Sequence, residues 1–161
     1  MRSKQTIYTL LLLGCVSLTA FTIVSTSNER GSHDIDPTVK AEVLQVLDEY
    51  MATFNANDLA AWEKTYHFPH YRLASGTMSV LDKAGLRDPA KVFTPLKQVG
   101  WHHSVWDHRN IVQASDTKVH VDTQFSRYKE DGTKIGTYES LYIVTKENGR
   151  WGVKLRSSYA E

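Results

Sequence analysis

Residues 138–160, YESLYIVTKENGRWGVKLRSSYA, carry the pattern on which the fold prediction depends. Two runs rich in aromatic and β-branched residues flank the dipeptide Asn148-Gly149. Asparagine and glycine tolerate the positive φ angles of a two-residue type I′ turn, which matches the twist of the strands on either side. The stretch therefore predicts two antiparallel strands joined by a tight hairpin.

The same pattern continues toward the N-terminus. Two further turn signals, Ser115-Asp116 and Asp131-Gly132, divide the chain from Trp101 onward into runs of strand-forming residues. Short loops of this kind join neighbouring antiparallel strands. The sequence therefore predicts a meander of four antiparallel strands that ends the domain.

Even-length loops at these turns also predict which residues face one another, since side chains alternate between the two faces of a strand. One predicted face is mainly apolar and aromatic, and we expect helices to cover it. Tyr142 lies in one of its apolar rows. Another row on this face is aromatic and consists of Trp106, Phe125, Tyr138 and Tyr159.

A polar row interrupts this apolar face. Buried polar groups cost about 1–3 kcal/mol each without a hydrogen bond, so these side chains either pair with one another or face a cavity. A polar row edged by aromatic rings is typical of a small-molecule pocket, and Arg127 is placed to form its mouth. The predicted members of the row are His108, Thr123, Ser140 and Ser157.

The opposite face of the meander is rich in charge. Asp107, Arg109, Asp122 and Arg156 are predicted to lie on it. Exposed ion pairs contribute at most about 1 kcal/mol each, so we assign this face no chemistry. It is predicted to be a solvated or subunit-facing surface.

Two helices are predicted before the first strands. Asp36 followed by Pro37 is typical of a helix start, because the aspartate accepts from free backbone N–H groups and proline needs no donor there. Apolar residues then recur at three- and four-residue steps. A shorter helix is expected after Asn57 or Asp58.

A hairpin and a third helix are predicted next. Two short strands flank Ser75-Gly76, and the third helix begins at Asp88-Pro89. An interior Pro95 kinks a helix, so a shorter helix begun at Thr94-Pro95 is the alternative. The resulting layout is α+β, with helices gathered over one face of a curved sheet.

Residues 1–27 are predicted to be a secretory signal peptide or an N-terminal membrane anchor. Two basic residues precede the apolar run IYTLLLLGCVSLTAFTIV. About 20 apolar residues can span a bilayer, so both forms stay open. Lipidation at Cys15 is the less favoured alternative, because apolar residues continue beyond it. Residues 28–35 are interpreted as a polar linker and residues 36–161 as one domain, exported to the periplasm or secreted.

Charge and histidine spacing exclude several classes of site. The formal net charge is +1 with both signs interspersed, so no nucleic-acid partner is expected. His102 and His108 share a predicted face but lie about 20 Å apart, too far for one metal ion. A metal held by His108 with His67 or His70 has no supporting motif. We therefore predict no metal and no cofactor.

The segment EYMATFNANDLAAWEKTY, residues 49–66, and the closing stretch quoted above resemble the SnoaL-like members of the nuclear-transport-factor-2-like superfamily. The resemblance extends over nearly the whole of residues 37 to 160. It implies a cone-shaped, cystatin-like α+β fold with three N-terminal helices packed on a curved antiparallel sheet. It also implies a pocket between helices and sheet and, often, a homodimer through the outer sheet face. The superfamily includes isomerases, dehydratases, cyclases, epoxide hydrolases and non-catalytic binders.

Only some functional residues of the superfamily have counterparts in this sequence. Tyr50 falls where ketosteroid isomerases have a tyrosine that donates to the developing oxyanion. Ala74 stands where those enzymes have their general-base aspartate, which argues against steroid-type isomerisation. Asp107 and Arg109 are the residue types of the epoxide hydrolases, but the predicted register points them away from the pocket.

These observations predict binding of a small, partly apolar molecule in the cone. The walls would be the aromatic row with Tyr142, and the polar row with Arg72 and Arg127 would anchor the ligand. An alternative is a cofactor-free lyase, isomerase or cyclase, in which His108 or His70 moves the proton and Tyr50 polarises a carbonyl. A second alternative is a non-catalytic dimerisation or interaction module. Whether the protein is an enzyme is left open.

Overall fold

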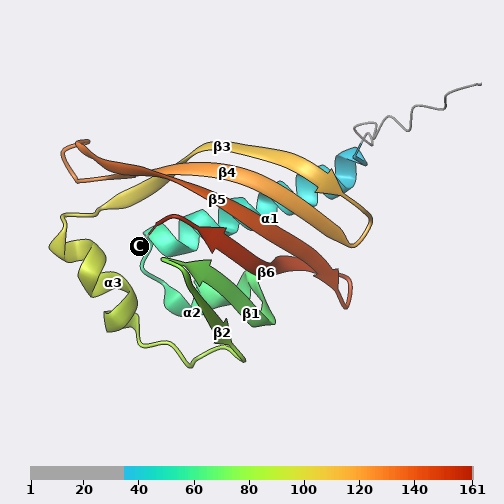
Figure 1. Ribbon diagram of the computed structural model, residues 1–161, viewed down its shortest axis with the longest axis horizontal. Coiled ribbons are helices and arrows are strands. Elements are labelled where there is room, and N and C mark those ends of the chain that lie inside the picture. The colour runs from blue at the N-terminus through green and yellow to red at the C-terminus, as the bar shows by residue number, and fades with distance from the viewer. Residues whose placement is uncertain (1–34, 161) are drawn as a thin grey trace, which may run out of the picture.

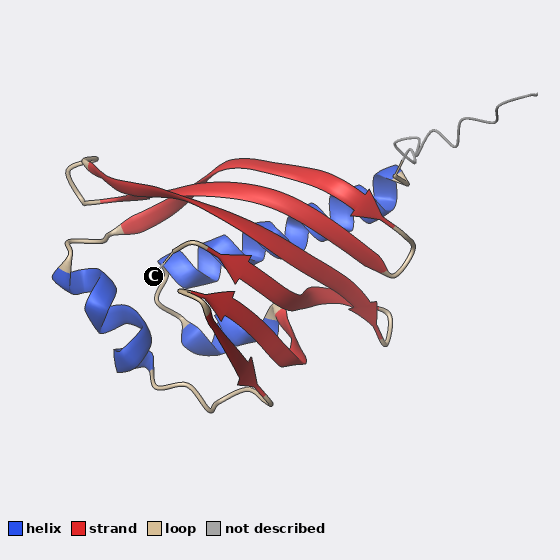
Figure 2. Cartoon of the chain, viewed as in Figure 1, coloured by secondary structure: helices blue, strands red, loops and turns tan. Residues whose placement is uncertain are grey.

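The computed structural model describes residues 35–160 (Figure 1). The predicted leader and nearly all of the predicted linker lie outside the described residues. Three helices lie on one side of a curved sheet (Figure 2), which confirms the α+β class and the curved sheet. Among residues 35–160, no helix is both long and apolar enough to cross a membrane.

The elements alternate between helices and strands. The bounds in chain order are α1 Pro37–Asn55, α2 Leu59–Lys64, β1 Tyr66–Ala74, β2 Thr77–Leu81, α3 Pro89–Gln98, β3 His103–Ala114, β4 Lys118–Tyr128, β5 Lys134–Glu147 and β6 Arg150–Ser158. Only two helices precede the first strand, so the prediction of three N-terminal helices is wrong. The third helix connects the β1–β2 hairpin to the meander.

The sheet has six strands in the order β2-β1-β6-β5-β4-β3. Neighbouring strands are antiparallel except β1 and β6, which run parallel. The prediction of a wholly antiparallel sheet is therefore wrong at this one pair. The chain leaves the hairpin through α3 and crosses the full meander, so its last strand returns beside β1 in the same direction.

Aspartates cap all three helices. The side chain of Asp36 accepts from the backbone N–H of Thr38, at 2.7 Å. Asp58 caps α2 in the same way, and Asp88 caps α3. Helix α3 begins at Asp88-Pro89 as predicted and continues through Pro95, so the shorter alternative is wrong.

The β5–β6 register follows the prediction only near the turn. Asn148 and Gly149 both have positive φ, as a type I′ turn requires. Val144 pairs with Val153 as predicted, but Ile143 pairs with Leu155, so the register slips by one residue. A β-bulge of this kind reverses which side chains face the core. Beyond it, Arg156 and Ser158 take the inner positions predicted for Leu155 and Ser157.

The β3–β4 pair contains two register shifts. Trp106 lies opposite Phe125, as predicted. The first shift follows immediately, so His108 lies opposite Gln124 and Arg109 opposite Thr123. The inner and outer assignments of His108 and Arg109 are therefore exchanged.

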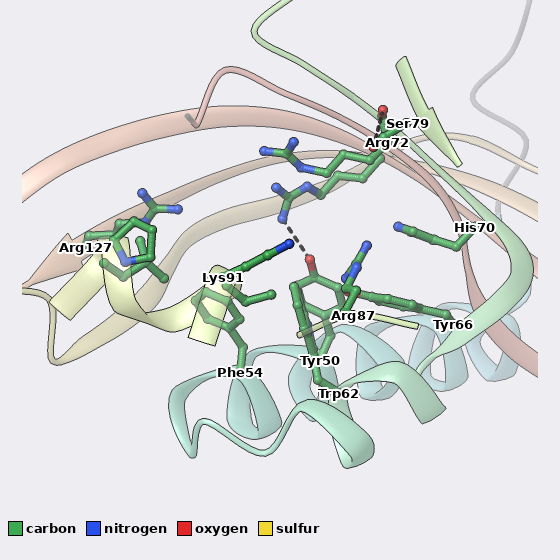
Figure 3. Close-up of a pocket in the computed structure, with 14 residues that line it drawn as sticks. Tyr50, Phe54, Trp62, Tyr66, His70, Arg72, Ser79, Arg87, Lys91 and Arg127 are labelled. Atoms are coloured by element: carbon green, nitrogen blue, oxygen red, sulfur yellow. Dashed lines mark hydrogen bonds between the residues drawn. The ribbon is translucent and has the colours of Figure 1, made fainter. Parts of the chain in front are cut away.

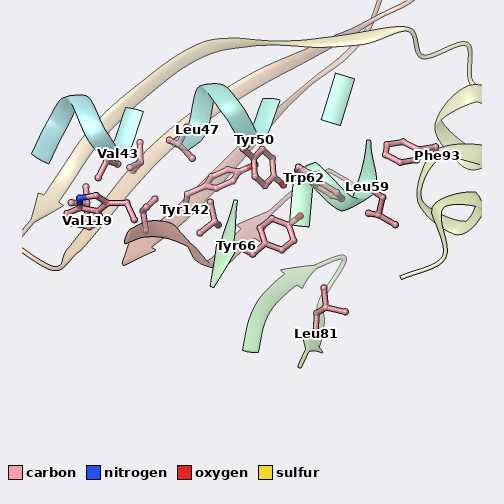
Figure 4. Packing of buried hydrophobic residues seen from close by; sticks show 14 of the residues in the cluster. Val43, Leu47, Tyr50, Leu59, Trp62, Tyr66, Leu81, Phe93, Val119 and Tyr142 are labelled. Carbon is pink, nitrogen blue, oxygen red and sulfur yellow. The ribbon is translucent and has the colours of Figure 1, made fainter. Parts of the chain in front are cut away.

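The core changes character along the cone (Figure 4). At one end, Val43 and Leu47 of α1 pack among the buried valines of the sheet, including Val119. At the other end, Tyr50 is followed by Trp62 and Tyr66, which are buried aromatic residues. The aliphatic end is filled by its own side chains, whereas the aromatic end borders a cavity.

Candidate functional site

A cavity of about 360 Å³ lies at the aromatic end of the core. Helix α1 places Tyr50 and Phe54 one turn apart, and α2 and β1 add Trp62 and Tyr66. These rings support one another: the centroids of Phe54 and Trp62 are 4.9 Å apart, and those of Tyr50 and Trp62 are 5.2 Å apart. The cavity therefore has a rigid aromatic wall.

The remainder of the lining is strongly basic. Among residues 35–160, no acidic side chain lines the cavity. No ion pair within residues 35–160 involves any of its cations. Figure 3 shows Arg72, Arg87 and Lys91 directed toward the same space, with Arg127 at the opposite end from His70. The five cationic side chains are Arg72, Arg87, Lys91, Arg127 and Arg156.

Arg156 is held by two hydroxyl groups. Its Nη1 donates to the hydroxyl oxygen of Tyr50 at 2.8 Å and lies 3.5 Å from that of Tyr142. Its Nε is buried and has no hydrogen-bond partner among residues 35–160. Burial raises the pKa of Tyr142, so this hydroxyl stays protonated. The positive charge of Arg156 is therefore not neutralised by a tyrosinate at Tyr142.

Arg72 and Arg127 approach the cavity from two other strands. Arg72 Nη2 donates to the backbone oxygen of Ala160 at 3.2 Å. Arg127 lies against the rings of Tyr138 and Phe125, at 4.7 and 5.7 Å from their centroids. Its Nε has no hydrogen-bond partner in the part of the chain that the structure describes. Burial lowers the pKa of both guanidinium groups, and the neighbouring Arg156 acts in the same direction. This direction is expected of buried cations that lack a counter-ion.

Arg87 belongs to the loop between β2 and α3. Its Nη1 donates to the Tyr66 hydroxyl at 3.1 Å, and its guanidinium lies 5.2 Å from the Trp62 ring centroid. The loop is held in place by Glu63, a buried residue of α2 whose carboxylate accepts from the backbone N–H of Gly85 at 2.7 Å. The loop conformation thus places Arg87 over the aromatic wall.

His70 presents a neutral ring to the cavity. It is buried, and it stacks on Tyr66 with ring centroids 4.0 Å apart. Its Nδ1 lies 3.1 Å from the backbone oxygen of Val153, which can only accept, so Nδ1 carries the proton. Burial lowers the pKa of His70 to about 4. At neutral pH its Nε2 is therefore an unprotonated acceptor.

The structure brings part of the predicted site together. Tyr50, His70, Arg72 and Arg127 line the cavity. Phe125 and Tyr142 line a small adjoining hollow, which shares Arg127 and Arg156 with the cavity. Two further predicted wall residues, Trp106 and Tyr138, pack behind this lining.

The predicted polar row lies outside the site. Thr123 donates to the backbone oxygen of Ser140 at 2.9 Å, and the Ser140 hydroxyl donates to that of Ser158 at 2.8 Å. Ser157, displaced by the bulge, pairs with Leu141 instead of Ser140. Thr123 and Ser140 therefore satisfy their hydrogen bonds across the sheet, which was the other interpretation of the pattern.

Two more predicted site residues are absent from the lining. His108 Nε2 lies 3.2 Å from the carboxylate of Asp122 on the outer face of the sheet, because the β3 bulge turns it there. Tyr159 is 79% exposed. The predicted roles of His108 as an acid–base group and of Tyr159 as a wall are therefore corrected.

Sequence patterns offered little signal for the remaining lining residues. Phe54, Trp62 and Tyr66 fit apolar helix or strand positions, so they were indistinguishable from ordinary core residues. Arg87 lies in a loop without periodicity, and Arg156 reaches the cavity only because of the bulge. The residues beyond the prediction are Phe54, Trp62, Tyr66, Ser79, Arg87, Lys91, Val92, Pro95, Leu96 and Arg156.

The site offers no obvious metal-binding set. Across residues 35–160, no group of three histidine, cysteine, aspartate or glutamate side chains is arranged to hold a metal ion. The chemistry available in the cavity is that of guanidinium and ammonium donors, tyrosine hydroxyls and one neutral imidazole.

Comparison with solved structures supports the fold assignment. A protein with a cystatin-like fold from Nostoc punctiforme has a TM-score of 0.65 at 16% identity, covering 78% of this chain and 93% of that chain. An NTF2-like protein from Novosphingobium aromaticivorans has a TM-score of 0.61 at 10% identity, covering 74% and 80%. A ketosteroid isomerase-like protein from Erwinia carotovora atroseptica has a TM-score of 0.56 at 18% identity, covering 74% and 93%. At these identities the likeness shows the fold alone.

A search of curated proteins found no match. The family model described as NTF2-like protein (DUF6841) matches residues 41–158, which is most of the chain. This match confirms the superfamily predicted from the sequence. The chain belongs to the NTF2-like protein family DUF6841.

Proposed function

We propose that this protein binds a small, partly apolar molecule in the cavity at the aromatic end of the cone. The observation that carries the proposal is the 360 Å³ cavity itself. Small-molecule sites are typically clefts of about 300–1,000 Å³ lined by apolar and aromatic groups with a few polar side chains. Here the apolar surface comes from the rings of Tyr50, Phe54, Trp62 and Tyr66, and the polar groups are the basic side chains.

Export is part of the same proposal. The support for it is the sequence of residues 1–27, with basic residues before an apolar run. A protein of this kind would meet its ligand outside the cytoplasm, either free or tethered to the membrane by its leader.

A blocking substitution tests the proposal. Ser79 lines the cavity, whereas its neighbour Met78 on β2 does not and is 53% exposed. Ser79→Trp should occupy part of the cavity, and Met78→Trp is the matched control. The readout is the fluorescence of anilinonaphthalene, a neutral apolar probe, titrated with the full chain. We expect wild type and Met78→Trp to bind and Ser79→Trp to lose most of the affinity. Equal binding by all three proteins, or binding by none, would overturn the proposal.

A second candidate function is cofactor-free acid–base catalysis, and the state of His70 favours it. The neutral ring offers its Nε2 as a base, and Tyr50, which accepts from Arg156, keeps its own proton available for a carbonyl oxygen. The test is exchange of the protons next to the carbonyl of phenylpyruvate in heavy water, followed by NMR. Exchange catalysed by wild type and lost in His70→Gln would support this function, and equal exchange in both would exclude it.

A further inference from the structure

The cavity gathers positive charge that the described protein does not neutralise. Five cations line it, and none of them forms an ion pair within residues 35–160. The polar partners that hold three of these cations are hydroxyl groups and a backbone oxygen, which carry no net charge. Burying a charge without a counter-ion is costly, and gathering like charges adds to the cost. A bound anion would neutralise these charges and stabilise the arrangement.

The arginines retain donors for such an anion. Within the described residues, the buried Nε of Arg156 has no hydrogen-bond partner, and neither has that of Arg127, which is only 9% exposed. A guanidinium group presents five N–H donors in a planar fork that matches the oxygens of a carboxylate or phosphate. Arg72 and Arg156 come from strands, and Arg87 comes from the loop fixed by Glu63. Donors therefore converge from three separate segments.

We infer that the ligand is a small organic acid whose oxyanion group binds among Arg72, Arg87 and Arg156, with its apolar part against the aromatic wall. Carboxylate, phosphate and sulfonate groups share this chemistry. Lys91 and Arg127 extend the positive field, which favours the entry of an anion. The inference rests on the proposed function, since it names the chemical class of the molecule in that same cavity.

A matched pair of probes separates charge from apolar contact. Anilinonaphthalene sulfonate differs from anilinonaphthalene by the anionic group, and the fluorescence of both reports transfer to an apolar site. The full chain is titrated with each probe. We expect the sulfonate to bind about tenfold more tightly or better, as charge-assisted hydrogen bonds predict. Ser79→Trp should lose both probes.

The variant Arg87→Gln/Lys91→Gln removes two charges from the loop and α3 while keeping polar side chains. It should reduce sulfonate affinity about tenfold and reduce the affinity for the neutral probe much less, so that the preference for the sulfonate falls. Lys97→Gln is the matched control, because Lys97 lies on the same helix without lining the cavity. It should leave both affinities unchanged. Arg127→Gln, from a different strand, repeats the test if the double variant does not fold.

Competition identifies the anionic group. Acetate and inorganic phosphate are added at an ionic strength matched with sodium chloride. Displacement of the sulfonate by acetate favours a carboxylate ligand, and displacement by phosphate favours a phosphoryl ligand. Glu161 follows Ala160, whose backbone oxygen accepts from Arg72, so the variant Glu161→Gln is also titrated. Tighter sulfonate binding by this variant would identify the Glu161 carboxylate as a competitor for the same cations.

The outcomes distinguish the two proposals. One outcome is that both probes bind with equal affinity, that Ser79→Trp weakens the binding of both, and that the charge variants change neither affinity. In that case the proposed binding pocket is supported and the organic-acid inference is wrong. If acetate and phosphate both fail to displace the sulfonate, the inference is also wrong. If no probe binding depends on Ser79, the proposed function fails and this inference fails with it.

Discussion

At the scale of single residues, His70 and Arg156 differ in their protonation state at neutral pH. Arginine keeps its proton at any ordinary pH, so Arg156 is a fixed positive charge. Histidine can lose its proton, and burial lowers the pKa of His70 to about 4. The cavity therefore combines permanent cations with one imidazole that is neutral at pH 7.

The lowered pKa of His70 predicts an acid-dependent loss of stability. The unfolded chain takes up this proton near pH 6.5, whereas the folded protein resists it until about pH 4. The contribution is fully present above pH 6.5 and declines as the pH falls toward 4. It amounts to about 3 kcal/mol at most. Urea unfolding at several pH values should show a steeper decline between pH 6.5 and 4 for wild type than for His70→Gln.

The control for this experiment is His102→Gln, because His102 is exposed. It should follow the wild-type pH dependence. Parallel curves for wild type and His70→Gln would show that the buried imidazole titrates normally, and the assignment of a neutral ring would be wrong.

At the scale of elements, helix α3 and the polar row of the sheet have separable roles. Helix α3 supplies Lys91, Val92, Pro95 and Leu96 to the cavity. The polar row supplies nothing to it and instead holds strands β4, β5 and β6 together. Substitutions in the two elements should therefore affect stability and binding differently.

Asp88 should matter to both properties. Its carboxylate caps α3 by accepting from the backbone N–H of Ala90 at 2.9 Å. Asp88→Ala should lower the free energy of unfolding by about 1 kcal/mol. Because the first turn of α3 carries Lys91, sulfonate affinity should also fall. Asp82→Ala, in the preceding exposed loop, should change neither quantity. Full stability in Asp88→Ala would contradict the capping role.

Thr123 should matter to stability alone. Its hydroxyl is fully buried and donates to the Ser140 backbone oxygen. Thr123→Val keeps the shape but leaves that oxygen without this donor, at a cost of about 1 kcal/mol. Thermal or urea unfolding measures the loss, and the probe titration should match wild type. A loss of probe affinity at unchanged stability would show that the polar row is part of the ligand site.

At the scale of the whole molecule, the outer face of the sheet is available for association. Val105 and Leu141 alternate with inward-facing neighbours on β3 and β5, and they are 45% and 37% exposed. A homodimer through this face is expected from the resemblance to superfamily members. A dimer would cover these apolar side chains and leave the cavity open, since the cavity lies on the other side of the sheet.

Leu141→Glu tests this association. A buried unpaired carboxylate would destabilise the interface, so sedimentation analysis should show a shift from dimer toward monomer. Leu86→Glu is the control, because Leu86 is exposed at 55% in the loop before α3. A monomeric wild type, or an equal shift in both variants, would argue against the outer-face dimer.

The sequence by itself determined the α+β class, the helix starts at Asp36 and Asp88, and the hairpin turn at Asn148-Gly149. These features depend on interactions within a few residues: a carboxylate accepting from nearby N–H groups, or a backbone angle that only some residues tolerate. Tyr50 and Arg72 were also predicted as site residues, because Tyr50 matched a superfamily position and Arg72 shared a strand face with His70.

Only the tertiary structure decided that Arg87, Lys91 and Arg156 join Arg72 and Arg127 at the cavity. The turns set the register of β6 and β3 locally, but one bulge in β6 and the first of two register shifts in β3 reversed the faces of the residues that follow. Bulges depend on how the whole sheet curves and packs against the helices, so the chain pattern gives no local sign of them. For that reason Arg156 faces the cavity and His108 faces outward, each on the opposite side of the sheet from its prediction. The lining of the basic cavity comes from three helices, four strands and one loop that meet in space, an arrangement that no short stretch of sequence contains.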